Sequence, residues 1–330
     1  MTKNFNVAII GNGRIGQALR YYFKQYSFVS RADFLSKDSD AGRYDLLVGA
    51  LPGEIGKKCL NLALKYRKNL IDISDIDPPE YLKQKSEIKK RGILVIPGCG
   101  FSPGLVNFIL GRYLFKPSSV KDIEVKAGSL SPKKDFYPFL WCFEDIVVEH
   151  TIPSWQIVSG KKKKFPVFAG RRQEKYFGIE AESYYCASGF ENILHKGLKS
   201  FVVRVVRPRG FRRFFSFIKS HGFIDKANIA ITKNMLESRK EDNFTFAEVN
   251  ITLKNAKSRW FIKSFSRKSD RLNSMQKITA SFPASLGKFL LQGKIQKSGL
   301  LFVDSIAQDK QIFEALLKET IGKGVQITHG

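Results

Sequence analysis

Three closely spaced glycines after an apolar run constrain this chain more than any other feature. Residues 8–19 read AIIGNGRIGQAL, and the run Val7–Ile10 has the pattern of a strand buried on both faces. From Arg14 onward, apolar residues recur at helical spacing. The pattern Gly11-x-Gly13-x-x-Gly16 therefore lies at a strand-to-helix turn.

Each glycine of such a turn has its own reason to lack a side chain. Gly11 makes the tight turn, Gly13 lets the backbone approach a pyrophosphate, and Gly16 lets the helix pack closely on the strand. The pyrophosphate would lie at the N-terminus of the helix. The motif predicts a dinucleotide-binding site, and the alternative is a tight turn that binds nothing.

Strands and helices alternate in the first third of the chain. Strands are expected at 44–52, 69–74 and 93–98, and helices at about 54–67 and 79–91. This alternation predicts an α/β fold with a Rossmann-type, doubly wound parallel sheet. Ligands of such sheets bind beyond the carboxyl ends of the strands, here at Gly11–Gly16, Ala50–Gly53, Asp72–Ser74 and Gly98–Gly104.

The alternation stops at about residue 118. Strand-like runs at 123–130, 147–152, 201–206, 246–253 and 259–265 predict an antiparallel sheet with intervening helices, a second α+β domain. From about Met275 the apolar spacing is helical again.

Composition excludes several classes of protein. The chain has 330 residues, 43% hydrophobic and 13% aromatic, enough for about two folded domains. Its start lacks a secretory signal pattern and no apolar run approaches the length of a membrane span, so we expect a cytoplasmic protein. The four cysteines and four histidines are scattered, so neither a metal site nor a disulfide framework is expected.

Five blocks, in order along the chain, resemble the saccharopine dehydrogenase family. They are DLLVGALPGEIGKKCLNLALKYRKNLIDIS at 45–74, GCGFSPGLVN at 98–107, IVVEHTIPSWQIVSGKKKKFPVF at 146–168, SYYCASGFENIL at 183–194 with VVRPRGF at 205–211, and NSMQKITASFPASLGKFLLQGKIQKSGLLFVD at 273–304. The resemblance implies an NAD(P)-dependent oxidoreductase that transfers hydride at a CH–NH bond of an amino-acid-derived substrate.

The resemblance also implies a domain plan and a homodimer. A nucleotide-binding domain over 1–118 would be completed by C-terminal helices at about 290–330, and residues 119–289 would bind substrate and mediate dimerisation. The chain departs from the family pattern at Ser102, often aspartate in the family, and at His150, Arg209 and Phe211. These departures leave an alternative open: a catalytically weak or inactive dinucleotide-binding protein whose basic second domain docks on an anionic surface.

The expected binding residues follow from the strand ends and the family blocks. For the cofactor they are Gly11, Gly13, Arg14, Ile15, Gly16, Asp33, Ala50, Leu51, Pro52 and Gly98. For the substrate they are Ser102, Pro103, Gly104 and Arg207. The planar fork of Arg207 suits a carboxylate, and Arg204 on the same strand is its alternative.

Three residues are candidates for catalysis. Glu149, on the expected strand 147–152, could hold a substrate ammonium or relay a proton, and the ordinary pKa of His150 suits proton transfer at neutral pH. Cys99 lies in the 98–104 loop and could touch substrate or cofactor. The alternatives are an exposed carboxylate, a structural histidine and a packed thiol.

Cofactor preference depends on the end of the second strand. Asp33 follows Gly11 by 22 positions and would bond the ribose 2′-hydroxyl of NAD. Arg31, with Lys37, could instead receive the 2′-phosphate of NADP if the strand ends two residues earlier. The sequence favours NAD.

The net charge of +26 implies attraction to something anionic. Residues 196–222 and 254–277 each carry eight Lys or Arg interleaved with aromatics, which can mark nucleic-acid or anionic membrane contact. The excess is spread, however, with 19 basic and 10 acidic residues up to 118 and 37 and 20 after it. We therefore favour buried aromatic faces backed by solvated basic faces over a nucleic-acid or membrane partner.

Overall fold

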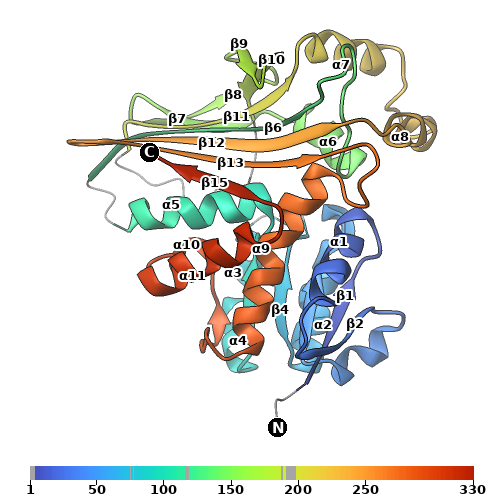
Figure 1. Ribbon diagram of the computed structural model, residues 1–330, viewed down its shortest axis with the longest axis vertical. Coiled ribbons are helices and arrows are strands. Elements are labelled where there is room, and N and C mark those ends of the chain that lie inside the picture. The colour runs from blue at the N-terminus through green and yellow to red at the C-terminus, as the bar shows by residue number, and fades with distance from the viewer. Residues whose placement is uncertain (1–3, 75, 77, 116–118, 187–188, 191–197) are drawn as a thin grey trace. The chain divides into compact units, whose positions relative to one another are not determined.

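The computed structural model describes residues 4–74, 76, 78–115, 119–186, 189–190 and 198–330, which form two compact units (Figure 1). Unit 1 comprises Met1–Phe115, Gly189–Ile193 and Gln276–Val325. Unit 2 comprises Lys116–Ser188, Leu194–Met275 and Gln326–Gly330. Each unit is built around one sheet.

Unit 1 has a six-stranded parallel sheet with the order β14-β5-β4-β3-β1-β2. Its strands are β1 (Phe5–Ile10), β2 (Val29–Phe34), β3 (Leu46–Gly49), β4 (Asn69–Asp72), β5 (Leu94–Pro97) and β14 (Gly299–Leu300). Its helices are α1 (Arg14–Phe23), α2 (Gly53–Tyr66), α3 (Pro78–Lys83), α4 (Lys85–Lys90), α5 (Val106–Leu114), most of α9 (Ser274–Leu291), α10 (Val303–Ile306) and α11 (Lys310–Ile321). The predicted Rossmann-type α/β fold is confirmed.

Burial explains why the apolar runs of unit 1 form central strands. Every residue of Val7–Ile10 and of Leu46–Gly49 is buried, as in strands covered on both faces. On α1 the buried side chains follow one helical stripe. The carboxyl ends of β1, β3, β4 and β5 consequently lie side by side along one edge of the sheet.

Unit 2 has a nine-stranded mixed sheet with the order β15-β13-β12-β6-β11-β10-β9, to which β7 is added through β11 and β8 through β7. Its strands are β6 (Val120–Leu130), β7 (Ser154–Val158), β8 (Lys161–Phe165), β9 (Arg172–Tyr176), β10 (Ile179–Tyr185), β11 (Ser200–Pro208), β12 (Asn243–Leu253), β13 (Lys257–Ser266) and β15 (Gln326–His329). Its helices are α6 (Phe143–Glu149), α7 (Phe211–Ser220) and α8 (Ile229–Glu237).

Two sequence predictions for unit 2 were wrong. The sheet is not wholly antiparallel, because β6 and β11 pair in parallel after a long crossover connection. Residues 147–152 do not form a strand, because Glu149 ends α6. The β-branched pair Val147-Val148 suggested a strand, but Phe143, Ile146 and His150 are buried at helical spacing and acids occupy the first turn.

The C-terminal part of the chain divides differently from the expected plan. Residues 276–289, expected in the second domain, belong to unit 1. Residues 326–330 belong to unit 2, because β15 adds to its sheet beside β13. The expected boundary at 118 lies outside the described residues.

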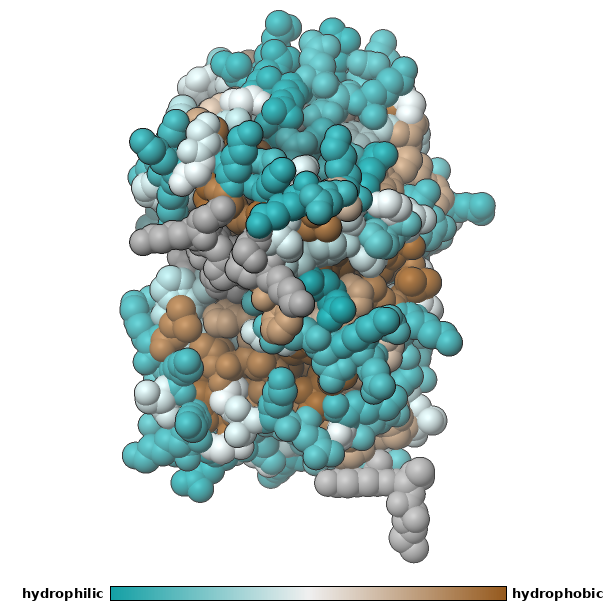
Figure 2. All heavy atoms as spheres, turned by 90° about the vertical axis from the view of Figure 1, so that its left-hand side faces the viewer, coloured by the Kyte–Doolittle hydropathy of each residue, from teal (hydrophilic) through white to brown (hydrophobic). Residues whose placement is uncertain are grey.

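Hydrophilic side chains cover much of unit 2 on the face drawn in Figure 2, which agrees with the larger basic excess after residue 118. Among the helices that the structure describes, none combines the length and the apolar character needed to cross a membrane.

Candidate functional site

The glycine turn between β1 and α1 has three positions with three different environments. Gly11 has a φ of +118°, and a Cβ there would come 2.4 Å from the carbonyl oxygen of Ala50. A Cβ on Gly16 would come 2.0 Å from the carbonyl oxygen of Gly11. A Cβ on Gly13 would meet no described atom within 4 Å apart from its chain neighbours. Gly11 and Gly16 are thus required by the fold itself, whereas Gly13 leaves open space.

The N-terminus of α1 lies at this open position. Gly13 is the N-cap residue, no side chain caps the helix, and its first turn contains no acid. Gln276 of α9 donates from Nε2 to the carbonyl oxygen of Arg14 (2.8 Å) and so steadies the turn. Uncapped amides and a positive dipole end favour an anion. The turn therefore fits the pyrophosphate of a dinucleotide.

A buried carboxylate ties together the loops after β3 and β4. Asp72 accepts hydrogen bonds from the Ser74 amide (2.9 Å) and the Tyr81 hydroxyl (2.8 Å), and the Ser74 hydroxyl accepts from the Leu51 amide (3.1 Å). Burial raises the pKa of Asp72, although the hydrogen bonds from Ser74 and Tyr81 oppose this. Asp72 and Ser74 thus set the position of the segment Ala50–Pro52.

Only part of this arrangement had a signal in the sequence. The position of Asp72–Ser74 at the carboxyl end of the expected strand 69–74 marked them as part of the ligand-binding edge. Neither the contribution of Tyr81, nine residues later on α3, nor that of Gln276 had a signal in the sequence. Both depend on contacts between distant segments.

The 98–105 loop after β5 is held by backbone geometry and by Asn107. Gly98 and Gly104 have positive φ angles of 59° and 134°, and the Ser102–Pro103 peptide bond is cis. The Asn107 side chain accepts from the Gly104 amide (3.1 Å) and donates to the carbonyl oxygen of Gly189 (3.3 Å). Ser102 and Pro103 are therefore presented on a fixed loop at the same sheet edge as the glycine turn.

Cys99 has the environment of a packed thiol. It is fully buried and donates to the carbonyl oxygen of Asp72 (3.2 Å). Burial, together with the nearby Asp72, raises the pKa of its thiol well above the ordinary value. Because the thiolate is the reactive form, Cys99 is unsuited to chemistry at neutral pH, and we leave it out of the proposed reaction.

The register of β2 places both candidate selectivity residues below the level of Gly11, with Asp33 one residue before the end of the strand. Asp33 pairs with Ala8 and Arg31 with Asn6, and the register continues to Ile9–Phe34. If the same register is continued by two residues, Ser36 lies beside Gly11. Asp33 is three residues earlier and therefore lies roughly 10 Å from that level, toward the amino end of the strand. The Asp33 carboxylate also lies 3.7 Å from the Arg20 guanidinium of α1.

In unit 2, three predicted residues meet in one buried cluster. Glu149 at the end of α6 forms an ion pair with Arg207 of β11 (2.5 Å), and Arg207 Nε lies 3.5 Å from His150 Nε2. His150 Nδ1 lies 2.8 Å from the carbonyl oxygen of Ile146. A fourth residue, Cys186, donates its thiol hydrogen to Glu149 (3.0 Å). The sequence had no signal for Cys186.

The titration of this cluster follows from its burial. Burial lowers the pKa of His150 to about 4, against the opposing effect of Glu149. Burial also acts to raise the pKa of Glu149, but Arg207 and His150 outweigh it, and this pKa lies below its ordinary value. At neutral pH His150 is therefore neutral, and the charges of Glu149 and Arg207 are directed at each other.

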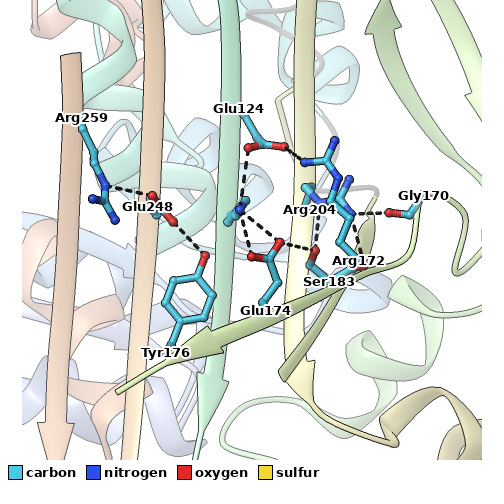
Figure 3. A network of polar contacts seen from close by, with 10 residues as sticks. Glu124, Gly170, Arg172, Glu174, Tyr176, Ser183, Arg204, Glu248 and Arg259 are labelled. Carbon is cyan, nitrogen blue, oxygen red and sulfur yellow. Dashed lines mark hydrogen bonds and ion pairs between the residues drawn. The ribbon is translucent and has the colours of Figure 1, made fainter. Parts of the chain in front are cut away.

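Arg204, the alternative to Arg207, belongs to a separate network on the unit 2 sheet (Figure 3). Its guanidinium donates to the Ser183 hydroxyl (3.0 Å) and to the carbonyl oxygen of Gly170. Neighbouring ion pairs join Lys126 to Glu174 (3.1 Å) and Arg172 to Glu124 (2.8 Å). These contacts link β9 and β10 to β6 and β11. Arg204 is fully buried within them, and its Nη1 atom has no hydrogen-bond partner among the described residues.

The structure thus gathers the predicted residues into two groups. The glycine turn, Ala50–Pro52 and the 98–104 loop lie at the carboxyl edge of the unit 1 sheet, and Glu149, His150 and Arg207 lie in the unit 2 cluster. Within the described part of the chain, no three His, Cys, Asp or Glu residues are arranged to hold a metal ion.

No protein-family model and no curated protein sequence matches the chain. Among solved structures it is similar to apo saccharopine dehydrogenase (L-Glu forming) from Saccharomyces cerevisiae, with a TM-score of 0.78 and 14% identity over 99% of this chain and 100% of that one. It also matches DAP dehydrogenase from C. glutamicum in complex with DAP, with a TM-score of 0.46 and 12% identity over 95% and 96% of the two chains. The chain has a saccharopine dehydrogenase-like fold.

Proposed function

We propose, from this saccharopine dehydrogenase-like fold, that the protein is an NAD(P)-dependent oxidoreductase acting on a CH–NH bond of an amino-acid-derived substrate. The observation that carries the proposal is the open position at Gly13, beside two glycines that the fold itself requires. A bound nicotinamide supplies hydride transfer. The chain's own residues bind and orient the reactants around it.

The proposed roles follow the positions of the residues. Gly11–Gly16 hold the pyrophosphate, and Ala50–Pro52, fixed by Ser74, flank the rest of the dinucleotide. Gly98 and the residues Ser102–Gly104 lie beside the nicotinamide and the substrate. Ser102 can offer a hydroxyl but not the charge of the family's aspartate, so it would orient a substrate amine by hydrogen bonding only.

We propose NADP as the preferred cofactor, against the preference for NAD suggested by the sequence. Asp33 and Arg31 lie below the level of Gly11, and Asp33 is paired with Arg20. Ser36 and Lys37 follow the strand end and are exposed. The nearby acid Asp38 is paired with Lys58 (2.8 Å). A hydroxyl and an ammonium at this level suit a 2′-phosphate better than a 2′-hydroxyl.

The test begins with binding. Calorimetry with NADP and NAD should give saturable binding that Gly13→Val abolishes while the circular dichroism of the protein is unchanged. The absorbance of the reduced cofactor is then followed with saccharopine, lysine and carboxylated polyamines. Turnover of one of these amines supports the proposed reaction, whereas cofactor binding with no turnover of any of them contradicts the assignment to a CH–NH bond.

A second function is favoured by the unit 2 cluster. Arg207 and Glu149 satisfy each other, and the low pKa of His150 makes it a poor proton carrier. These observations support a catalytically weak dinucleotide-binding protein. Tight cofactor binding without turnover of any amine in the same panel would favour this alternative over the oxidoreductase.

A further inference from the structure

Four large apolar side chains are exposed on the segment that runs from α7 to α8 of unit 2. The exposed fractions are 53% for Phe217, 43% for Phe223, 64% for Ile231 and 67% for Met235. The inward-facing residues of the same segment already pack with α6 in a separate core cluster. The four side chains, here named the α7–α8 apolar patch, thus form an outer apolar surface. This corrects the expectation that the aromatics of this segment are buried, because Phe217 is not.

Two kinds of contact within the segment link the elements that carry the patch. The rings of Phe217 and Phe223 stack with centroids 6.2 Å apart. Thr232 of α8 donates its hydroxyl hydrogen to the carbonyl oxygen of Phe223 (2.7 Å), which holds α8 against that turn. Ile231 and Met235 are four residues apart on α8 and therefore project side by side.

Basic residues are frequent in the segment that carries the patch. Residues 209–240 contain eight Lys or Arg and two acids. The exposed members are Arg209, Arg212, Arg213, Lys219, Lys226, Arg239 and Lys240. The eighth, Lys233, is paired with Glu144 of α6 (2.8 Å). The segment therefore exposes both basic and large apolar side chains.

The combination points to one kind of partner. A second copy of the chain would bring two sets of exposed basic side chains together, which costs electrostatic energy. Nucleic acid would bind the basic side chains and could stack on the phenylalanines, but it offers no apolar phase for Ile231 and Met235. The boundary between anionic headgroups and acyl chains accommodates both features. We infer that the α7–α8 surface docks the protein on anionic lipid bilayers.

The test is sedimentation of the full-length protein with vesicles. Because each basic residue near an anionic surface strengthens binding several-fold, partition onto vesicles of phosphatidylcholine with about 30% phosphatidylserine should exceed partition onto phosphatidylcholine alone by at least roughly tenfold. The difference should largely disappear at about 0.5 M salt, where screening is strong. Equal partition onto both vesicle types would overturn the inference.

Two variants measure the apolar and the basic contributions to binding separately. Ile231→Ser with Met235→Ser should reduce binding to the anionic vesicles by roughly tenfold, and Arg212→Gln with Arg213→Gln should do so by a similar factor. The matched control is Leu82→Ser with Lys89→Gln and Lys90→Gln on α3 and α4, where an exposed leucine also has basic neighbours. This control should bind as the unmodified protein does.

Other outcomes identify other occupants and contradict the inference. If the Ile231→Ser, Met235→Ser variant changes the mass measured by light scattering but not vesicle binding, the patch joins two copies of the chain. If the variants weaken binding to a single-stranded oligonucleotide and leave vesicle binding unchanged, the surface serves nucleic acid. An equal loss in the α3–α4 control would mean that general positive charge, and not this surface, drives vesicle binding.

Discussion

The glycine turn of unit 1 and the Glu149–Arg207 pair of unit 2 both contain residues that the sequence marks as functional, but they are built in opposite ways. At the turn, the backbone leaves space: a Cβ on Gly13 would meet no described atom within 4 Å beyond its neighbours. At the pair, side chains fill the space and each charge faces another. The turn can receive a ligand as it stands, whereas the pair would have to open first.

The chemistry of a residue does not by itself define its role. An arginine fork suits a substrate carboxylate, and it equally suits the carboxylate of a nearby glutamate. Once both are buried, breaking the pair leaves an uncompensated charge, which is costly. A glycine has no side chain that could pair with a neighbour or fill the space beside it. An exposed glycine with free space at a helix N-terminus is therefore the more direct sign of a ligand.

We expect the largest change in the free energy of unfolding at one glycine of the turn and almost none at another. Gly16→Ala should destabilise the protein by about 3 kcal/mol or more, because its Cβ would lie 2.0 Å from the Gly11 carbonyl oxygen. Gly13→Ala should change the free energy of unfolding by less than about 0.5 kcal/mol while weakening dinucleotide binding. Urea unfolding and calorimetry measure the two quantities. Equal destabilisation by both variants would show that the turn reserves no space for a ligand.

The next effect tests whether the unit 2 pair is structural. Glu149→Gln and Arg207→Met should each cost about 3–5 kcal/mol in unfolding free energy, and the double variant should cost less than their sum. Arg172→Met is the matched control, since its exposed pair with Glu124 should contribute under about 1 kcal/mol. If Arg207→Lys instead raises KM with no loss of stability, Arg207 binds substrate.

The free energy of unfolding should depend on pH through the titration of His150. Its folded pKa of about 4 lies below the ordinary 6.5, so the unfolded chain binds the proton more readily between these values. The contribution of a neutral His150 to the free energy of unfolding is therefore fully present above pH 6.5. It falls as the pH drops toward 4, by at most roughly 1.4 kcal/mol per pH unit.

His150→Phe keeps a ring in the pocket and removes this titration. Its unfolding free energy, measured in urea at several pH values, should be flatter than that of the unmodified protein between pH 6.5 and 4.5. Below that range, protonation of Glu149, whose folded pKa is lowered by Arg207, should still destabilise both proteins. Parallel curves for the two proteins would mean that His150 is not buried as a neutral ring.

The smallest effect concerns cofactor choice at the edge of unit 1. Lys37→Ala should weaken NADP binding by roughly tenfold, about 1.4 kcal/mol, and leave NAD binding unchanged. Asp33→Ala should leave the ratio of the two dissociation constants within about twofold, because its side chain lies below the level of Gly11 and beside Arg20. A shift toward NADP in Asp33→Ala would restore the role that the sequence suggested for it.

The sequence predicted best where structure depends on local backbone chemistry. The glycine turn and the alternating strands could be predicted because the residues that determine each of them lie within a few positions of one another in the sequence. The role of Asp33 stays a prediction, because distance from Gly11 along the chain says nothing of the register between β1 and β2. The helix at 143–149 was missed because Val147 and Val148 outweighed the spacing of the buried residues around them.

The partners of buried side chains could not be predicted in the same way. Cys186 meets Glu149 only because β10 and the end of α6 come together, and nothing near either residue in the sequence announces this. The same holds for Phe217: its neighbours Phe211 and Phe215 are buried, and only the packing of α7 on α6 decides which phenylalanine stays outside.

The late return of α9 to unit 1 has a consequence for synthesis of the protein. Ala280, Ala284 and Leu286 of this helix are fully buried, and Gly287 lies against the ring of Phe23 in α1. Residues 1–115 leave the ribosome long before this cover exists, because the chain must first supply residues 116–275. At 5–20 residues per second, the delay is on the order of ten seconds or more. During that time part of the apolar surface of the nascent unit is open to chaperones and to aggregation.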